Sequence, residues 1–153
     1  MDPRHDWSLE EVVAIHDLPI TDLLLRAQTV HRQHHAPDSV QLCTLLSVKT
    51  GGCPEDCAYC PQSSKHATQV EPERMLSVDE VLAAARAARA AGSTRFCMGA
   101  AWRDALEGPA FERMLTMVRG VRARGLAAGA TLGMVLDAQA EALAAAGLTA
   151  YNH

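Results

Sequence analysis

Three segments in the second half of the chain repeat one pattern: apolar residues at helical spacing, a glycine, and then a short apolar run. The first segment opens with Ser77 and Glu80 at the spacing of a capping box and ends at Gly92. Its expected buried face consists of Val78, Val81, Leu82 and Ala85. The apolar run that follows, residues 94–101, predicts a strand.

The second segment predicts a helix that begins near Pro109 and ends at Gly125. Apolar residues at i, i+3, i+4 and i+7 mark the side of this helix that we expect to face a core. They are Phe111, Met114, Leu115, Val118 and Val121. Another apolar run, residues 126–133, follows the glycine and predicts a second strand.

The third segment is shorter than the other two. We expect Asp137 to cap its helix and Gly147 to end it, before a strand over residues 148–153. Upstream of all three segments, residues 44–50 also have the composition of a strand. Four strands separated by single helices predict an α/β fold with a parallel sheet. A closed (β/α) barrel takes about 250 residues, so we expect about half of a TIM-type barrel and a chain cut from something larger.

Two further helices are expected before the first strand. Ser8 and Glu11 form the capping box of the first helix, and residues 19–35 have the pattern of the second. We therefore divide the chain into a helical lead-in, residues 1–40, and a partial barrel, residues 41–153, that contains strands 1 to 4.

Composition and charge exclude several classes of function. The chain has 153 residues, a net charge of −4 and six aromatic residues, so it offers neither a basic stripe nor a stacking surface for nucleic acid. No stretch has the length of apolar sequence that a signal peptide or a membrane helix needs. The expectation is a soluble, non-exported protein of the cytoplasm.

The strongest chemical signal is the loop after the first strand, which contains Cys53, Cys57 and Cys60 at C-x3-C-x2-C spacing. An odd total of five cysteines and this close spacing fit metal ligation in a reducing compartment better than disulfides. Thiolates bind zinc or iron–sulfur clusters. Three thiolates leave one iron of a four-iron cluster open to a substrate, whereas structural zinc needs a fourth ligand. The nearest candidate for that ligand is His66.

Other possible ligands have no spacing typical of a zinc site. His31 and His35 lie one helical turn apart, but such histidines are usually solvated, and we assign no role to them or to His34. Cys43 is expected in the core. Methionines 75, 98, 114, 117 and 134 are expected to fill the core as well.

The segment CPEDCAYC resembles the signature of the radical S-adenosylmethionine enzymes. Over nearly the whole chain, the resemblance extends to the biotin synthase family within that superfamily. It is carried by the segments TLLSVKTGGCPEDCAYCPQSSKH, GSTRFCMGAAWR, TLGM and GLTAYNH, which occur in the order found in that family.

This resemblance implies a 4Fe-4S cluster on Cys53, Cys57 and Cys60, with the open iron chelating S-adenosylmethionine. An electron from the cluster would cleave the sulfonium, and a 5'-deoxyadenosyl radical would abstract hydrogen from dethiobiotin, into which sulfur is inserted to form biotin. The resemblance also implies an electron donor such as flavodoxin or ferredoxin, and a homodimer.

Further site residues follow from the same resemblance. Tyr59 would lie near the adenine of S-adenosylmethionine, and Met98 and Gly99 would also contact the cofactor. Lys49 and Asn152 would face the pocket between cofactor and substrate, where they are the expected catalytic residues.

A second cluster, 2Fe-2S, is the sulfur donor that the resemblance implies, with Cys97 as one ligand. Gly129 stands where the family has a second cysteine, and Cys97 alone would not hold such a cluster. We therefore expect no biotin-forming turnover from this chain by itself. A non-catalytic iron–sulfur or zinc binding fragment remains the alternative, and a split enzyme completed by a separate chain is a third possibility.

Overall fold

A computed structural model describes residues 4–153, which divide into two compact units, one ending at Val40 and the other spanning Gln41–His153. The first unit contains helix α1 (Leu9–His16) and helix α2 (Ile20–His34). The capping box predicted at the start of α1 is present: the Glu11 N–H donates to Ser8 Oγ, and the Ser8 N–H donates to Glu11 Oε2 at 2.9 Å. None of the helices in the described residues is long and apolar enough to cross a membrane.

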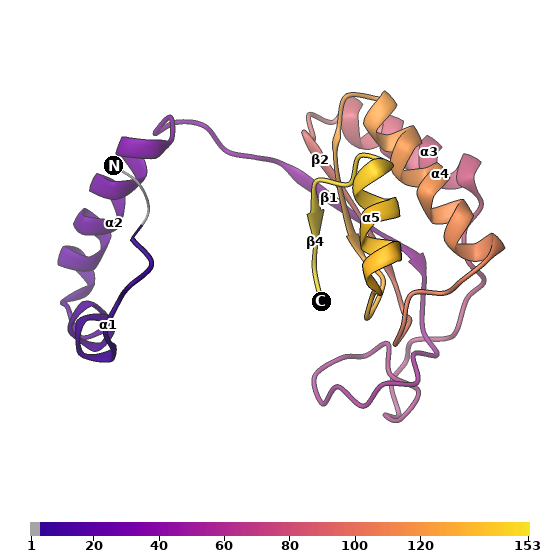
Figure 1. Cartoon of the computed structure of the whole chain (residues 1–153), viewed down its shortest axis with the longest axis horizontal. Coiled ribbons are helices and arrows are strands. Elements are labelled where there is room, and N and C mark those ends of the chain that lie inside the picture. Colours follow the sequence, from indigo (N-terminus) through magenta and orange to yellow (C-terminus); the bar gives the residue numbers. More distant parts are fainter. Residues whose placement is uncertain (1–3) are drawn as a thin grey trace. The chain divides into compact units, whose positions relative to one another are not determined.

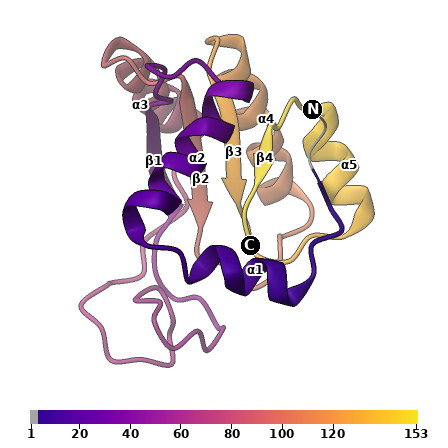
Figure 2. The same cartoon turned by 90° about the vertical axis from the view of Figure 1, so that its left-hand side faces the viewer.

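The second unit is a βα series built around one parallel sheet. Strands β1 to β4 follow one another in the sheet in chain order, and each adjacent pair is parallel. Helices α3, α4 and α5 connect them and cover one face of the sheet (Figures 1 and 2). The predicted α/β class is thus confirmed, as parallel units consistent with a partial TIM-type barrel. The elements are β1 (Cys43–Lys49), α3 (Val78–Ala90), β2 (Arg95–Ala100), α4 (Pro109–Ala123), β3 (Ala127–Thr131), α5 (Asp137–Ala145) and β4 (Ala150–Tyr151).

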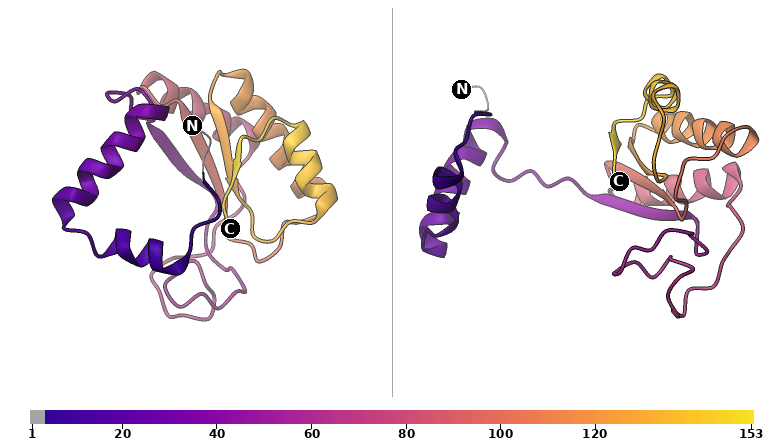
Figure 3. Two further views of the ribbon diagram at one scale, coloured as in Figure 1. Left: turned by 60° about the vertical axis from the view of Figure 1, so that its left-hand side comes forward. Right: turned by 60° about the horizontal axis from the view of Figure 1, so that its bottom comes forward.

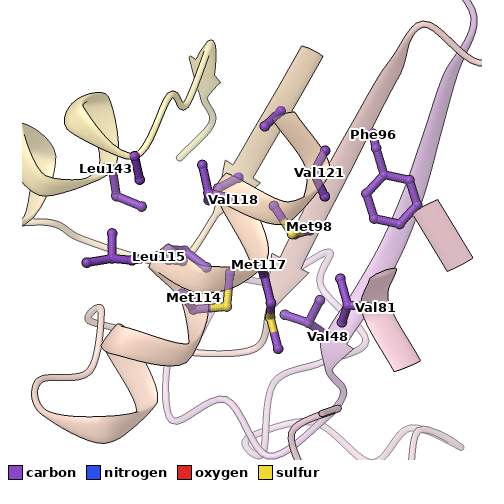
Figure 4. Close-up of a cluster of buried hydrophobic side chains, with 14 of the residues drawn as sticks. Val48, Val81, Phe96, Met98, Met114, Leu115, Met117, Val118, Val121 and Leu143 are labelled. Atoms are coloured by element: carbon purple, nitrogen blue, oxygen red, sulfur yellow. The ribbon is translucent and has the colours of Figure 1, made fainter. Parts of the chain in front are cut away.

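The core lies between the sheet and its three helices (Figure 4). Along β2, side chains alternate, so Phe96 and Met98 are fully buried under the helices while Cys97 faces the opposite side. All five residues of the stripe predicted on α4 are buried, and Met117 joins them. Val81 and Ala85 of α3 are buried as predicted. The second face of the sheet carries none of these helices, as two further views show (Figure 3).

Helix α3 begins as the sequence predicted, whereas α5 does not. At α3 the Glu80 N–H donates to Ser77 Oγ, and the Ser77 N–H donates to Glu80 Oε2 at 2.7 Å. At α5 the capping residue is Leu136, and its N–H donates to the Gln139 side chain at 2.9 Å. The prediction of Asp137 as the cap was wrong by one residue. Asp137 is the first helical residue, where its carboxylate still interacts favourably with the helix dipole.

Two residues expected in the core lie outside it. Cys43 is exposed, because it is the first residue of β1 and faces the side of the sheet away from the helices. Met134 is 44% exposed, because it follows β3 in a loop instead of continuing the strand. Met98, Met114 and Met117 are fully buried, as expected.

Candidate metal and cofactor site

The loop with three cysteines lies beyond the carboxyl end of β1, where functional groups gather in parallel α/β sheets (Figure 2). Gly51 and Gly52 begin it with φ angles of +66° and +68°. This left-handed conformation suits glycine, and a Cβ on Gly51 would also press on the Glu71 carbonyl oxygen at 3.0 Å. The glycine pair therefore turns the chain sharply off the strand, as the sequence predicted.

Hydrogen bonds within the loop fold it back on itself. The Cys53 N–H donates to the Gln62 carbonyl oxygen at 2.9 Å, and the Ser64 N–H donates to the Cys53 carbonyl oxygen at 2.8 Å. The buried Ser63 hydroxyl donates to the Glu55 carbonyl oxygen at 2.5 Å. These bonds hold the two ends of the cysteine motif side by side, which brings its three thiols to one region of the molecule.

Cys53, Cys57 and Cys60 line a single cavity of about 390 Å³. Its other walls come from β1, from the segment after β2 and from the segment after β3, including Trp102 and Met134. The site is thus assembled from the carboxyl ends of neighbouring strands. Its mixture of thiols, an aromatic ring and apolar side chains suits a soft metal group that carries an organic ligand.

The chemistry of the donor set fits an iron–sulfur cluster. All five cysteines of the chain are free, and the three loop thiols face the same cavity, with Cys57 exposed and Cys53 and Cys60 half-buried. Within residues 4–153, no three His, Cys, Asp or Glu side chains converge closely enough to hold one metal ion. Ligation therefore requires these three side chains to turn toward one another.

Two ion pairs fix charged side chains around the loop. Arg103 Nε lies 3.2 Å from Glu55 Oε2, which links the segment after β2 to the cysteine motif, and both residues line the cavity. His66 Nε2 lies 3.2 Å from Asp56 Oδ1. The imidazole considered as a fourth zinc ligand is thus paired with a carboxylate.

The two expected catalytic residues do not line the cysteine cavity in this structure. Lys49 donates from Nζ to the carbonyl oxygens of Thr50 and Gly51 and borders a neighbouring, smaller cavity. Asn152 is exposed after β4, and its backbone N–H donates to the Ala130 carbonyl oxygen at 2.9 Å. Both lie at the carboxyl ends of strands, as expected, but their side chains are not brought together with the thiols.

Of the three residues expected to contact the cofactor, one lines the cysteine cavity and two do not. Gly99 lines the cysteine cavity. Tyr59 belongs to the cysteine loop but is 92% exposed. The Met98 side chain is fully buried beneath the helices, so only its backbone is available to a ligand on the cavity side.

Cys97 lies in the middle of β2 and does not line the cysteine cavity, and its Sγ is 3.4 Å from Cys43 Sγ. Burial, followed by the hydrogen bond with Cys43, raises the pKa of the Cys97 thiol. Gly129 of β3 is its neighbour in the sheet register, and a Cβ added there would lie 2.5 Å from the Cys97 sulfur. Because Gly129 has no side chain, the Cys97 sulfur occupies the space that a Cβ at position 129 would fill.

Several residues of the cavity were not singled out as site residues. Glu55, Trp102, Arg103, Thr131 and His153 line it. Their position in the sequence could have identified them, because each follows or ends a predicted strand or lies within the cysteine motif. Which of them turn toward the thiols depends on loop geometry, which the pattern of apolar residues does not specify.

Known proteins resemble this chain over nearly its whole length. Residues 47–153 match the radical SAM superfamily. The chain is 67% identical over 151 residues to a biotin synthase of Sorangium cellulosum, covering 99% of this chain and 43% of that protein. It is 60% identical to a biotin synthase of Myxococcus xanthus (100% and 44% covered) and 59% identical to one of Methylobacterium nodulans (98% and 45%). The chain thus spans less than half the length of these curated relatives. The match over β1 to β4 and the cysteine loop shows that the chain belongs to the radical SAM superfamily.

Proposed function

We propose that this chain carries the cluster-binding and S-adenosylmethionine-binding part of a biotin synthase-type reaction, in which sulfur is inserted into dethiobiotin. One observation carries the proposal: three free thiols at C-x3-C-x2-C spacing line one cavity at the carboxyl end of a parallel sheet. The identity of 59–67% to proteins named biotin synthase supports the choice of reaction within the superfamily.

In this proposal Cys53, Cys57 and Cys60 hold a 4Fe-4S cluster. When bound, that cluster supplies the electron that splits S-adenosylmethionine. The residues of the chain position and shield it. The hydrogen bonds of the cysteine loop set the spacing of the thiols, and the Glu55–Arg103 pair fastens the loop to the segment after β2. Trp102 supplies a flat apolar surface for an aromatic ligand group.

The remaining site residues take more peripheral roles. Gly99 lets a ligand approach the backbone of β2 closely, and Met98 contributes through its backbone. Tyr59 covers the adenine when the loop closes on the cofactor. Lys49 and Asn152 contact substrate or cofactor from the carboxyl ends of β1 and β4.

A wider set of assignments belongs to the same proposal. Residues 1–40 form the helical lead-in and residues 41–153 the partial barrel. Dethiobiotin is the substrate, a flavodoxin or ferredoxin is the electron donor, the assembly is a homodimer, and the compartment is the cytoplasm. A 2Fe-2S cluster as sulfur donor has Cys97 in place, while Gly129 has no donor atom. That observation favours a second candidate, a chain that binds a cluster or zinc without forming biotin.

The test is anaerobic reconstitution with iron and sulfide, followed by electron paramagnetic resonance of the reduced protein with and without S-adenosylmethionine. We expect one 4Fe-4S cluster per chain and a signal that changes when S-adenosylmethionine is added. Cys57→Ala should abolish the cluster. Ser64→Ala, at an exposed side chain in the same loop, is the matched control and should retain it.

Two outcomes would contradict the proposal. A cluster whose signal ignores S-adenosylmethionine would support the non-catalytic binding fragment. Retention of stoichiometric zinc in place of iron, with all three loop thiols protected, would show that the motif serves a structural metal.

A further inference from the structure

The side chain of Gln62 connects the two ends of the cysteine loop. Gly51, at the start of the loop, is buried, and its N–H donates to Gln62 Oε1 at 2.5 Å. In the part of the chain that the structure describes, no backbone carbonyl accepts from this N–H. A buried backbone N–H without a partner is unfavourable, so the Gln62 side chain stabilises the turn that Gly51 makes.

The backbone of the same glutamine holds Cys53. The Cys53 N–H donates to the Gln62 carbonyl oxygen at 2.9 Å, and Cys53 forms an isolated parallel bridge with Ser63. A single bridge is a short piece of strand pairing with little support from its neighbours. The side-chain bond to Gly51, two residues before Cys53, adds a second attachment between the same two segments. Gln62 therefore fixes the chain on which the first thiol of the motif lies.

The position of Gln62 in the motif gives these two bonds a consequence for the thiols. Gln62 lies two residues after Cys60, so its bonds connect the first cysteine of the motif with the third. The Cys60 N–H donates to the Cys57 carbonyl oxygen at 3.0 Å, which fixes the second cysteine to the third. Gln62 and all three cysteines line one cavity. We propose that Gln62 is a positioning residue, which sets Cys53 against Cys60 and so pre-organises the three thiols.

Gly51 is a firm point of attachment because other contacts also hold it. Lys49 donates from Nζ to the Gly51 carbonyl oxygen. The preceding residue, Thr50, accepts at its carbonyl oxygen from the Glu73 N–H at 2.9 Å. The bond from Gln62 thus ties the far end of the cysteine loop to a segment that is already fixed at the end of β1.

The chemistry of the glutamine side chain allows a precise test. Because the amide nitrogen only donates, Oε1 is the atom of this side chain that can accept from the Gly51 N–H. Glutamate has the same length and keeps an acceptor at this position. Methionine has a similar length, but its thioether sulfur is a weak acceptor. The two substitutions therefore separate the hydrogen bond from the size of the side chain.

The first experiment compares the metal-free full chain with Gln62→Met and Gln62→Glu by amide hydrogen exchange, measured by NMR. In Gln62→Met the Gly51 amide should exchange several-fold faster, up to about tenfold, because one hydrogen bond is lost. Gln62→Glu should restore the protection. Gln62→Asn, whose amide is one carbon too short to reach Gly51, is the second variant in case Gln62→Met does not fold.

Alkylation of the metal-free chain, followed by mass spectrometry, tests the thiols themselves. Cys53, which is half-buried, should react faster in Gln62→Met, whereas the exposed Cys57 should react at the rate of the parent. Thr68→Val is the matched control. It removes a 2.8 Å hydrogen bond to the Pro61 carbonyl oxygen in the same loop, without a contact to Cys53, and should leave both rates unchanged.

The consequence for cluster assembly rests on the function proposed for the loop, and reconstitution with iron and sulfide tests it. Gln62→Met should incorporate iron several-fold more slowly than the parent, and Gln62→Glu should recover the rate. Unchanged exchange and alkylation in Gln62→Met would overturn the proposal, and so would altered exchange with iron incorporation at the parent's rate. If the parent forms no cluster while exchange and alkylation change as expected, the function proposed for the loop fails and the positioning of Cys53 stands.

Discussion

Single residues in this chain serve more than one interaction, and Glu80 is the clearest case. Its carboxylate caps α3 by accepting from the Ser77 N–H at 2.7 Å and also accepts from both terminal nitrogens of Arg74, at 2.6 Å and 2.9 Å. The hydrogen bond with Arg74, followed by that from Ser77, lowers the pKa of Glu80 from 4.5 to about 2. The cap is therefore sensitive to acid.

Because folding lowers the pKa of Glu80, its ionised carboxylate stabilises the folded protein. The contribution of Glu80 to stability is fully present above its unfolded pKa of 4.5 and is lost as pH falls toward about 2. Glu80→Gln should therefore reduce the urea midpoint near neutral pH, and the difference from the parent should shrink as pH approaches 2. Asp79→Asn, one residue earlier in the same helical turn, is the control. An equal difference at every pH would show that the charge of Glu80 plays no part.

Glycine 133 offers a second test at the residue scale. It has a φ angle of +80°, and a Cβ on it would overlap the carbonyl oxygen of Arg103, which accepts a hydrogen bond from the Met134 N–H at 2.8 Å. Gly133→Ala should destabilise the protein by several times the cost of Gly92→Ala. Gly92 also has a positive φ, +94°, but a Cβ added there would only touch Leu42 Cδ1 at 3.8 Å, which is an ordinary contact. Chemical denaturation of both variants separates overlap from the backbone strain of about 1–2 kcal/mol. Equal losses would contradict this account.

At the scale of elements, the sequence predicted most of what local rules determine. The helices that begin at Ser77 and Pro109 and the glycines that end them are where capping and periodicity placed them. The start of α5 was missed because Gln139, not Asp137, satisfies the backbone at the cap. Aspartate is the commoner cap, so the pattern favoured the wrong residue.

The candidate site was also predicted only in part from the sequence. The cysteine spacing predicted the loop, and the order of strands and helices predicted the end of the sheet at which it lies. The pairing of Cys43 with Cys97 required the register of β1 against β2, which fixes two sulfurs that are 54 residues apart in the chain. Register is a tertiary property, and no pattern along one strand contains it.

Helix α4 gives the test at this scale. Met117 lies fully buried in the stripe that faces the sheet. Met117→Ala should lower the free energy of unfolding by about 2–5 kcal/mol, because it removes packed atoms and leaves a cavity. Arg113→Ala, at an exposed position of the same helix, should change it by about 0.5 kcal/mol or less. Thermal or urea unfolding followed by circular dichroism measures both, and similar values for the two variants would mean that α4 is not packed as described.

Within the unit that spans Gln41–His153, the sheet organises the other elements. Within the described residues, β1 pairs only with β2, and β4 pairs only with β3 through two residues. Both outer strands thus leave backbone groups unpaired, and Leu45 on the open face is 71% exposed. Open edges of this kind promote association between chains.

We expect the isolated chain to associate as its concentration rises. Sedimentation velocity over a range of concentrations should show an increasing average mass. Leu45→Lys should reduce that increase, because a charged side chain on the open face disfavours apolar contact, while Arg86→Lys on the exposed side of α3 should leave it unchanged. A single monomeric species at every concentration, with a sharp cooperative thermal transition, would contradict this expectation.

The alternation along β2 also limits how this protein can evolve. Phe96 and Met98 build the core, whereas Cys97 and Gly99 serve the open face. An inserted or deleted residue within the strand would exchange the two sets, placing a thiol in the core and aromatic and thioether side chains in solvent. Descendants of this sequence can therefore change the chemistry of the open face by substitution, one position at a time, while the length of β2 stays fixed.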